Sequence, residues 1–251
     1  MRNLLFTLRF DGARYHGWQV QPNGITVQAV FQDSLEQVLH ERPDLKGCSR
    51  TDAGVHANMF CVSLRTRRDI PCARLVSAVN HFLPPDVAVL RCREVPADFH
   101  ARYDCRGKEY IYQIWNAPVR DPFLYRRALH YWYPLDGETL KEGASHYVGR
   151  HDFTSFCTLD KREGRNFCRT VSHARVERDG DLVRFIIGAD GFLYNMVRIL
   201  TGTLLAVAQG KLRPMDIPAV FDARDRAAAG PTAPPQGLFL NRVFYDEGVL
   251  S

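Results

Sequence analysis

The sequence predicts an α+β fold built from two similar halves, each with helices on one face of a mostly antiparallel sheet. Segments that alternate apolar and polar residues, as half-buried strands do, recur along the whole chain. Segments with apolar residues at helical spacing lie between these predicted strands. The predicted order of elements in each half is therefore roughly β-α-β-β-α-β, although the two halves share no clear sequence repeat. The chain has 251 residues, 45% of them hydrophobic, which suffices for a sizeable core. We place the halves at residues 1–104 and 105–251 and expect a functional cleft between them.

The first half begins with a strand and continues through a turn-rich stretch into a helix. Every second side chain in residues 3–10 is apolar, which predicts the strand. Thr26 is a suitable helix N-cap, and an apolar stripe with helical spacing follows it: Val27, Val30, Phe31, Leu35, Val38 and Leu39. The remaining predicted elements are a short segment at 46–50, a strand at 58–64, a helix at 72–83 and a strand at 86–93. Pro84 and Pro85 end that second helix, because proline does not continue one.

The second half is predicted to follow the same order. Its expected elements are a strand at 108–115, a helix near 136–148, strands near 170–178 and 182–189, a long helix at about 191–209, a further helix and a closing strand at 238–246. The sequence RDGD between the two middle strands is typical of a hairpin turn. Gly210 is placed to end the long helix, and PTAPPQG interrupts the chain before the last strand.

Composition limits the class of protein. The net charge of +5 permits nucleic-acid binding without requiring it. The seven cysteines are scattered and form no CxxC pair, so we expect neither structural zinc nor a disulfide framework, and reduced thiols fit the cytoplasm. No apolar run approaches the roughly 20 residues of a membrane span, and the N-terminus shows no secretion signal.

Positive charge is concentrated in two segments. Residues 65–74 carry four arginines against one acidic residue, and residues 161–178 carry six lysines and arginines against two glutamates. Each segment is compatible with a solvated surface and with contact to phosphate.

Asp52 and Arg50 are the first candidates for chemistry, in the sequence CSRTDAGVHA at residues 48–57. Asp52 precedes Ala53 and Gly54, so it lies at a turn that can present a carboxylate outward. A neighbouring guanidinium would keep that carboxylate ionised. The alternative is a structural Asx-turn with Arg50 as its surface partner.

Arg198, Tyr110 and Tyr112 are the second group of candidates. Arg198 lies in the strongly apolar FLYNMVRILTGTLLAV, where an arginine either pairs with a distant acid or extends its head group to solvent. Tyr110 and Tyr112 are two residues apart and face one side of a strand, where they either pack in the sheet or stack on a base.

Other chemistries find little support in the sequence. It contains no HExxH, no GxSxG, no phosphate loop and no zinc-deaminase pattern. His56 follows Asp52 by four residues, but no second ligand lies at metal spacing, so we expect no metal.

Six blocks of the sequence, in order, resemble the tRNA pseudouridine synthase A (TruA) family. RTDAGVHA at residues 50–57 resembles its signature. The other blocks are FDGARYHGWQ (10–19), DFHARYDCRGKEYIY (98–112), HDFTSF (151–156), NMVR (195–198) and PTAPPQGLFL (231–240). The resemblance extends over essentially the whole chain. One departure is Ser49, where the family often has glycine before R-T-D.

The resemblance implies a function and a set of roles. It implies the pseudouridine synthase fold, conversion of uridine to pseudouridine at positions 38, 39 and 40 of the tRNA anticodon arm, no cofactor and no metal, and a homodimer. Asp52 matches the catalytic aspartate and Tyr110 the tyrosine that packs on the target base. Arg50 matches the arginine that flips and holds the nucleotide, and Arg198 the arginine that pairs with the aspartate.

Three alternatives stay open at this point. The first is a non-catalytic RNA-binding protein on the same fold, and the second is an enzyme of the same superfamily that acts on another RNA or at other tRNA positions. A glycosidase is the third, although the sequence offers no second carboxylate at a defined separation.

Overall fold

The structure is a computed structural model that describes residues 1–158 and 166–250. The chain forms two compact units, Met1–Arg106 with Phe239–Ser251, and Gly107–Leu238. Each unit packs helices against a mostly antiparallel sheet, so the predicted α+β class is confirmed. None of the helices in the described ranges is long and apolar enough to cross a membrane.

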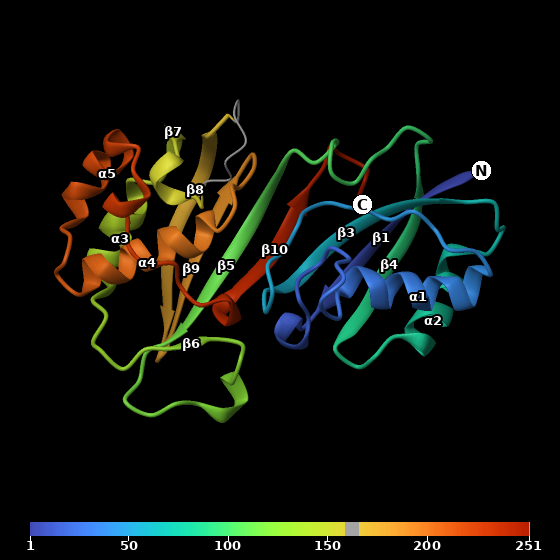
Figure 1. Cartoon of the computed structure of the whole chain (residues 1–251), viewed down its shortest axis with the longest axis horizontal. Helices are drawn as coiled ribbons and strands as arrows, with labels where there is room; N and C mark the ends of the chain where they lie inside the picture. The colour runs from blue at the N-terminus through green and yellow to red at the C-terminus, as the bar shows by residue number, and fades with distance from the viewer. Residues whose placement is uncertain (159–165, 251) are drawn as a thin grey trace. The chain divides into compact units, whose positions relative to one another are not determined.

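The first unit contains four main strands in the order β4-β1-β3-β10. Their bounds are β1 Arg2–Phe10, β3 His56–Thr66, β4 Val87–Val95 and β10 Leu238–Phe244, and the short β2 (Lys46–Gly47) pairs with β3. β1 runs antiparallel to both β3 and β4, whereas β10 runs parallel to β3. The helices α1 (Val27–Leu39) and α2 (Cys72–Phe82) lie side by side along these strands (Figure 1).

The core of this unit follows the predicted apolar stripes. Thr26 accepts a hydrogen bond from the Ala29 N–H and so caps α1 as expected. Four members of the α1 stripe are buried, namely Val27, Phe31, Leu35 and Leu39, while Val30 and Val38 are partly buried. The Phe31 ring meets Phe6 of β1 edge to face at 5.6 Å. The helix therefore docks through the face that its sequence period marks.

The second unit contains the strands in the order β5-β9-β8-β7. Their bounds are β5 Gly107–Trp115, β9 Leu182–Ala189, β8 Cys168–Asp179 and β7 Gly149–Asp152, with the short β6 (Leu129–His130) beside β5. Its helices are α3 (Gly137–Ser145), α4 (Met196–Ala208) and α5 (Ile217–Ala223) (Figure 1). Single 3-10 turns across both units are η1 Gly12–Arg14, η2 Pro122–Leu124, η3 Thr154–Phe156, η4 Pro214–Asp216, η5 Arg226–Ala228 and η6 Pro235–Gly237.

The predicted hairpin is confirmed. Asp179 pairs with Leu182, so only Gly180 and Asp181 form the turn between β8 and β9. Gly180 has φ +57°, which the first central residue of a two-residue hairpin turn favours and which glycine adopts without strain.

The predicted start of the long helix at residue 191 is wrong, because α4 begins only at Met196. Asn195 precedes it with φ +60°, a left-handed conformation that asparagine tolerates and a helix does not continue through. The predicted end is confirmed, since Gly210 has φ +68° and its N–H donates to the Val207 carbonyl. Residues 191–195 are therefore a loop, and this loop contributes to the site.

Candidate active site

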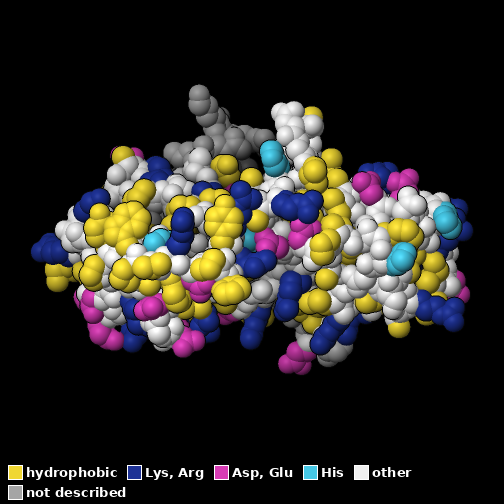
Figure 2. All heavy atoms as spheres, turned by 90° about the horizontal axis from the view of Figure 1, so that it is seen from below, with side chains coloured by type: hydrophobic (Ala, Val, Ile, Leu, Met, Phe, Trp, Pro, Cys, Tyr) yellow, Lys and Arg dark blue, Asp and Glu magenta, His cyan; other side chains and the backbone are white. Residues whose placement is uncertain are grey.

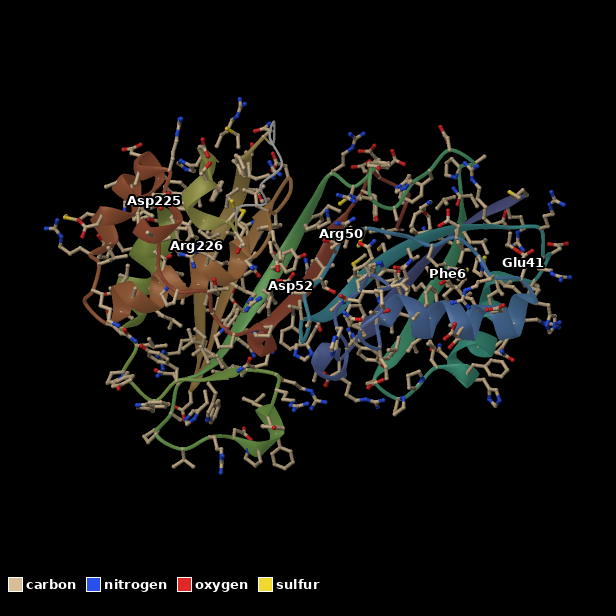
Figure 3. The ribbon with its side chains drawn as sticks, viewed as in Figure 1. Phe6, Glu41, Arg50, Asp52, Asp225 and Arg226 are labelled. Atoms are coloured by element: carbon tan, nitrogen blue, oxygen red, sulfur yellow. The ribbon has the colours of Figure 1, made fainter. Side chains whose placement is uncertain are left out.

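Arg50 and Asp52 lie on the loop that leads into β3 (Figure 3). Arg50 is exposed and Asp52 is half-buried. The loop turns tightly after the aspartate, because the Val55 N–H donates to the Asp52 carbonyl at 3.2 Å and Gly54 has φ +78°. The turn that the sequence predicts is thus present, and glycine meets its conformational demand.

Residues 12–17 of the turn-rich stretch hold this loop through backbone contacts. A Cβ on Gly12 would lie 1.9 Å from the Val55 carbonyl oxygen, and one on Gly17 would lie 2.2 Å from the Thr51 carbonyl oxygen. Between them, the Tyr15 carbonyl accepts a hydrogen bond from the Gly54 N–H at 3.1 Å. Both glycines therefore permit a backbone approach that any side chain would prevent. The blocks at residues 10–19 and 50–57 form one structure around Asp52.

His56 has a structural role next to this loop. Its ring is buried, its Nδ1 accepts a hydrogen bond from the Gly12 N–H at 3.0 Å, and it stacks on Phe239 at 4.5 Å. Among the residues that the structure describes, no three His, Cys, Asp or Glu side chains gather as metal ligands would. His56 thus links the loop, the turn-rich stretch and β10.

Tyr110 lies on β5 in the second unit, where it pairs in register with Ile187 of β9. Its ring is 6% exposed and meets Phe192 edge to face at 4.9 Å. Tyr112 lies deeper on the same face, and its hydroxyl donates to the Pro234 carbonyl at 2.7 Å. Burial raises the pKa of the Tyr112 phenol well above its ordinary value, although the nearby Arg198 opposes the shift. Tyr112 is therefore the structural tyrosine of the pair, and Tyr110 stands nearer the surface.

Arg198 lies in the first turn of α4 with its guanidinium held on two sides. Nε donates to the Ala233 carbonyl at 2.7 Å, and Nη1 donates to Asn195 Oδ1 at 2.9 Å. The Ala233 N–H in turn donates to the Arg198 carbonyl at 3.0 Å. These hydrogen bonds fix the direction of the head group before any substrate is present.

The position of Ala233 depends on two glycines. A Cβ on Gly202 would lie 1.7 Å from the Pro231 carbonyl oxygen, and one on Gly230 would lie 2.6 Å from the Gly202 carbonyl oxygen. The Gly230 N–H donates to Thr203 Oγ1 at 2.9 Å. The segment at residues 230–233 therefore lies directly on the α4 backbone and brings the Ala233 carbonyl to Arg198.

The two basic segments differ in how their charges are used. Arg65, Arg67, Arg68 and Arg74 are all exposed, and the described chain places no acidic side chain in an ion pair with any of them. In the second segment, Lys161, Arg162 and Arg165 lie outside the described residues. Its other arginines have partners: Arg169 donates to two backbone carbonyls, Arg175 pairs with Glu177 at 2.9 Å, and Arg178 donates to Asn116 and the Leu135 carbonyl. The segment at 65–74 is the better candidate for phosphate contact.

Each unit thus holds two of the four predicted site residues. Arg50 and Asp52 share one loop in the first unit, and Tyr110 and Arg198 belong to the second. Sequence reasoning missed Phe192 and Asn195, because it assigned both to the interior of a helix. Asn195, a polar residue that interrupts the apolar run, was the signal available for that loop.

Comparison with known proteins decides the family. The family model of tRNA pseudouridine synthases matches residues 7–104 and 144–246. The tRNA pseudouridine synthase A of Acetivibrio thermocellus is 41% identical over 245 residues, which are 98% of this chain and all of that protein. Those of Geotalea daltonii and Caldicellulosiruptor bescii are 43% and 40% identical with the same coverage. The chain belongs to the tRNA pseudouridine synthase family.

Members of this family are isomerases that convert uridine to pseudouridine. The predicted family and enzyme class are therefore confirmed, and the matched stretches include both the Asp52 loop and the first turn of α4.

Proposed function

We propose that this enzyme isomerises uridine to pseudouridine at positions 38, 39 and 40 of the tRNA anticodon arm, with Asp52 as its catalytic residue. The observation that carries the proposal is the loop at residues 50–55, which presents one carboxylate and is held by backbone contacts from Gly12 and Gly17. A loop held in this way suits a catalytic group that must be positioned against a reacting atom to within a fraction of an ångström.

The reaction needs few groups. The N1–C1′ bond of the uridine breaks, the base turns, a C5–C1′ bond forms, C5 gives up its proton and N1 ends protonated. Atoms and electrons balance without an oxidant or reductant, so no cofactor is required. The carboxylate of Asp52 acts at the sugar, either as a nucleophile at C1′ or as a base that removes a proton from the ring.

The other three residues handle the flipped nucleotide. A base in a stacked stem must leave the stack at a cost of a few kcal/mol before it can react. We propose that Arg50, which is exposed on the loop, holds the extruded nucleotide, and that the Tyr110 ring packs on its base. Arg198 is proposed to pair with Asp52 and keep it ionised; its fixed head group supports this role.

Tritium release tests the chemistry. We expect wild-type enzyme to release tritium from tRNA labelled at uridine C5, and Asp52→Asn to release it at least about a thousandfold more slowly while binding tRNA about as well. Asp44→Asn, an exposed aspartate of the same unit, is the matched control. Mapping the product then shows whether positions 38–40 carry the modification. Full activity of Asp52→Asn would show that Asp52 is not the catalytic residue.

We also propose a cytoplasmic homodimer. None of the seven cysteines, all of which lie in the described residues, is in a disulfide, and free thiols suit a reducing compartment. The second unit exposes large apolar side chains between β5 and α3, namely Val119, Phe123, Tyr125, Trp132 and Tyr133, and Figure 2 shows hydrophobic side chains gathered over that part of the unit. Light scattering on the purified protein would give twice the mass of the chain, and a monomer at micromolar concentration would refute the dimer.

A further inference from the structure

A pocket of about 510 Å³ lies in the first unit, away from the Asp52 loop, and four arginines line it. They are Arg9 of β1, Arg91 and Arg93 of β4, and Arg242 of β10. Among the described residues of its lining, none is acidic. Like charges that converge on one pocket repel each other, and the protein does not neutralise them from within the lining. The pocket therefore favours an anion from outside.

Two of the four arginines, Arg9 and Arg91, are the ones available to a ligand. Arg9 donates only weakly to the protein, from Nε to the Asn58 carbonyl at 3.3 Å, and both Arg9 and Arg91 are exposed. No ion pair joins either of them to an acidic side chain in the described chain. Arg93 differs, since its Nη1 donates to the carbonyls of Gly248 and Val249 and holds the C-terminal segment beside the pocket. Arg9 and Arg91 thus offer the donors that remain for a ligand.

Two irregularities of the sheet meet at this pocket. The pairing of β1 with β4 shifts between Thr7 and Leu8, which leaves Leu90 as an extra residue next to Arg91. The pairing of β1 with β3 shifts between Leu8 and Phe10, so that Asn58 and Met59 together oppose Arg9. Leu90, Asn58 and Met59 all line the pocket. β-Bulges redirect side chains and are over-represented next to functional sites. Here the two irregularities lie on either side of β1, close to Leu8 in both pairings.

A hydrogen bond also joins two polar side chains of the lining. The Asn58 amide donates to Asn241 Oδ1 at 2.9 Å, which ties β3 to β10 within the lining of the pocket. Several guanidinium and amide groups in one pocket match the oxygens of a phosphate better than they match a single carboxylate, because a phosphate accepts several hydrogen bonds at once.

We propose that this pocket binds a phosphate group, and that its source is the backbone of the tRNA substrate. The choice of source rests on the proposed function. Asn58 follows Asp52 by six residues, so the two residues are at most about 22 Å apart along an extended chain. A phosphate held there would anchor the RNA at a second point and leave the chemistry to the Asp52 loop.

The test compares two double variants of the full chain. Arg9→Gln with Arg91→Gln removes two charges from the pocket, and Arg120→Gln with Arg150→Gln removes two exposed charges of the second unit that no described acidic side chain pairs with. Dissociation constants for tRNA are measured from about 50 to 300 mM salt. Loss of one phosphate contact weakens binding about five- to tenfold at 0.1 M salt and lowers the salt slope by about 1. We expect this loss of affinity and this lower salt slope for the pocket variant only.

The outcomes separate the possibilities. Equal affinity of both variants and wild type overturns the proposal, and equal weakening of both variants overturns it as well, since net charge would then explain the effect. Loss of pyrophosphate binding by calorimetry with unchanged tRNA affinity would assign the pocket to a free phosphate and overturn the RNA source. Affinity is read without catalysis, so a wild type that binds tRNA but releases no tritium would refute the proposed function and leave this test intact. Thermal unfolding of each variant confirms that it is folded.

Discussion

Gly202→Ala should disturb Arg198 from one helical turn further along the same face of α4. An alanine Cβ would lie 1.7 Å from the Pro231 carbonyl oxygen, so the segment at residues 230–233 must move away from the helix. Three hydrogen bonds depend on that approach: the Arg198 Nε to the Ala233 carbonyl, the Ala233 N–H to the Arg198 carbonyl, and the Gly230 N–H to Thr203 Oγ1. The substitution therefore acts on the Arg198 head group without touching it.

The expected cost follows from these contacts. A neutral hydrogen bond contributes about 0.5–1.5 kcal/mol and one from a charged donor about 1.5–3 kcal/mol. Loss of all three amounts to roughly 2.5–6 kcal/mol, and alanine returns about 1 kcal/mol through its higher helix propensity. We expect the free energy of unfolding to fall by roughly 1.5–5 kcal/mol.

Gly137→Ala is the matched control. Gly137 is the first residue of α3 in the same unit, and nothing lies within 4 Å of the Cβ it would carry. This substitution should leave stability unchanged or raise it by up to about 1 kcal/mol.

Urea unfolding and tritium release measure the two effects separately. At a temperature where Gly202→Ala is still folded, its kcat should fall because Arg198 loses the carbonyl that orients it, whereas Gly137→Ala keeps the wild-type kcat. If Gly202→Ala matched Gly137→Ala in both measurements, the close approach of residues 230–233 to α4 would not position Arg198.

Three further predictions concern the loop, the surface and the core. Gly17→Ala should slow tritium release at least about tenfold, because its Cβ would lie 2.2 Å from the Thr51 carbonyl oxygen and its φ of +81° disfavours alanine; an unaltered rate would show that this contact does not hold the loop. Arg67→Glu with Arg68→Glu should weaken tRNA binding and lower its salt slope by about 1–2, and an unchanged slope would mark residues 65–74 as ordinary surface. Burial raises the pKa of the Tyr147 phenol, so the folded protein keeps it neutral while the unfolded chain ionises it near pH ~10. Stability should therefore fall as pH rises past about 10, less steeply in Tyr147→Phe, and an equal slope in urea titrations would refute this.

Local elements were predictable where the sequence carries a local signal. The apolar pattern of residues 3–10, the Thr26 cap and the turn at Gly180 and Asp181 each act over a few residues, and the strand, the capped helix and the hairpin that they predict are present in the structure. The start of α4 was not predictable in this way, because leucine and tyrosine before Asn195 continue the apolar pattern while the left-handed Asn195 interrupts the helix. Periodicity reports which face is buried, and it does not report where the backbone turns.

Long-range placement is harder to obtain from a single sequence. The last strand follows the second half in sequence, yet Phe239 and Leu240 pair with His56 and Ala57 at the start of β3. Nothing in residues 238–246 indicates that partner, because a short apolar strand fits many sheet edges. The candidate site shows the same limit: Asp52 and Arg198 are visible as motifs, whereas the Ala233 carbonyl that orients Arg198 is a backbone atom without a signature.

Asp52 and Arg198, each within its own unit, are positioned by the same kind of contact. Gly12 and Gly17 let carbonyls of the Asp52 loop approach another backbone, and Gly202 does the same for the segment that orients Arg198. Contacts between backbones involve no rotatable side chain, so they fix a position more narrowly than side-chain packing does. A substitution at any of these glycines would act on catalysis through geometry and would leave the chemical groups in place. The glycines in FDGARYHGWQ and the aspartate in RTDAGVHA therefore belong to one site, although they stand far apart in the sequence.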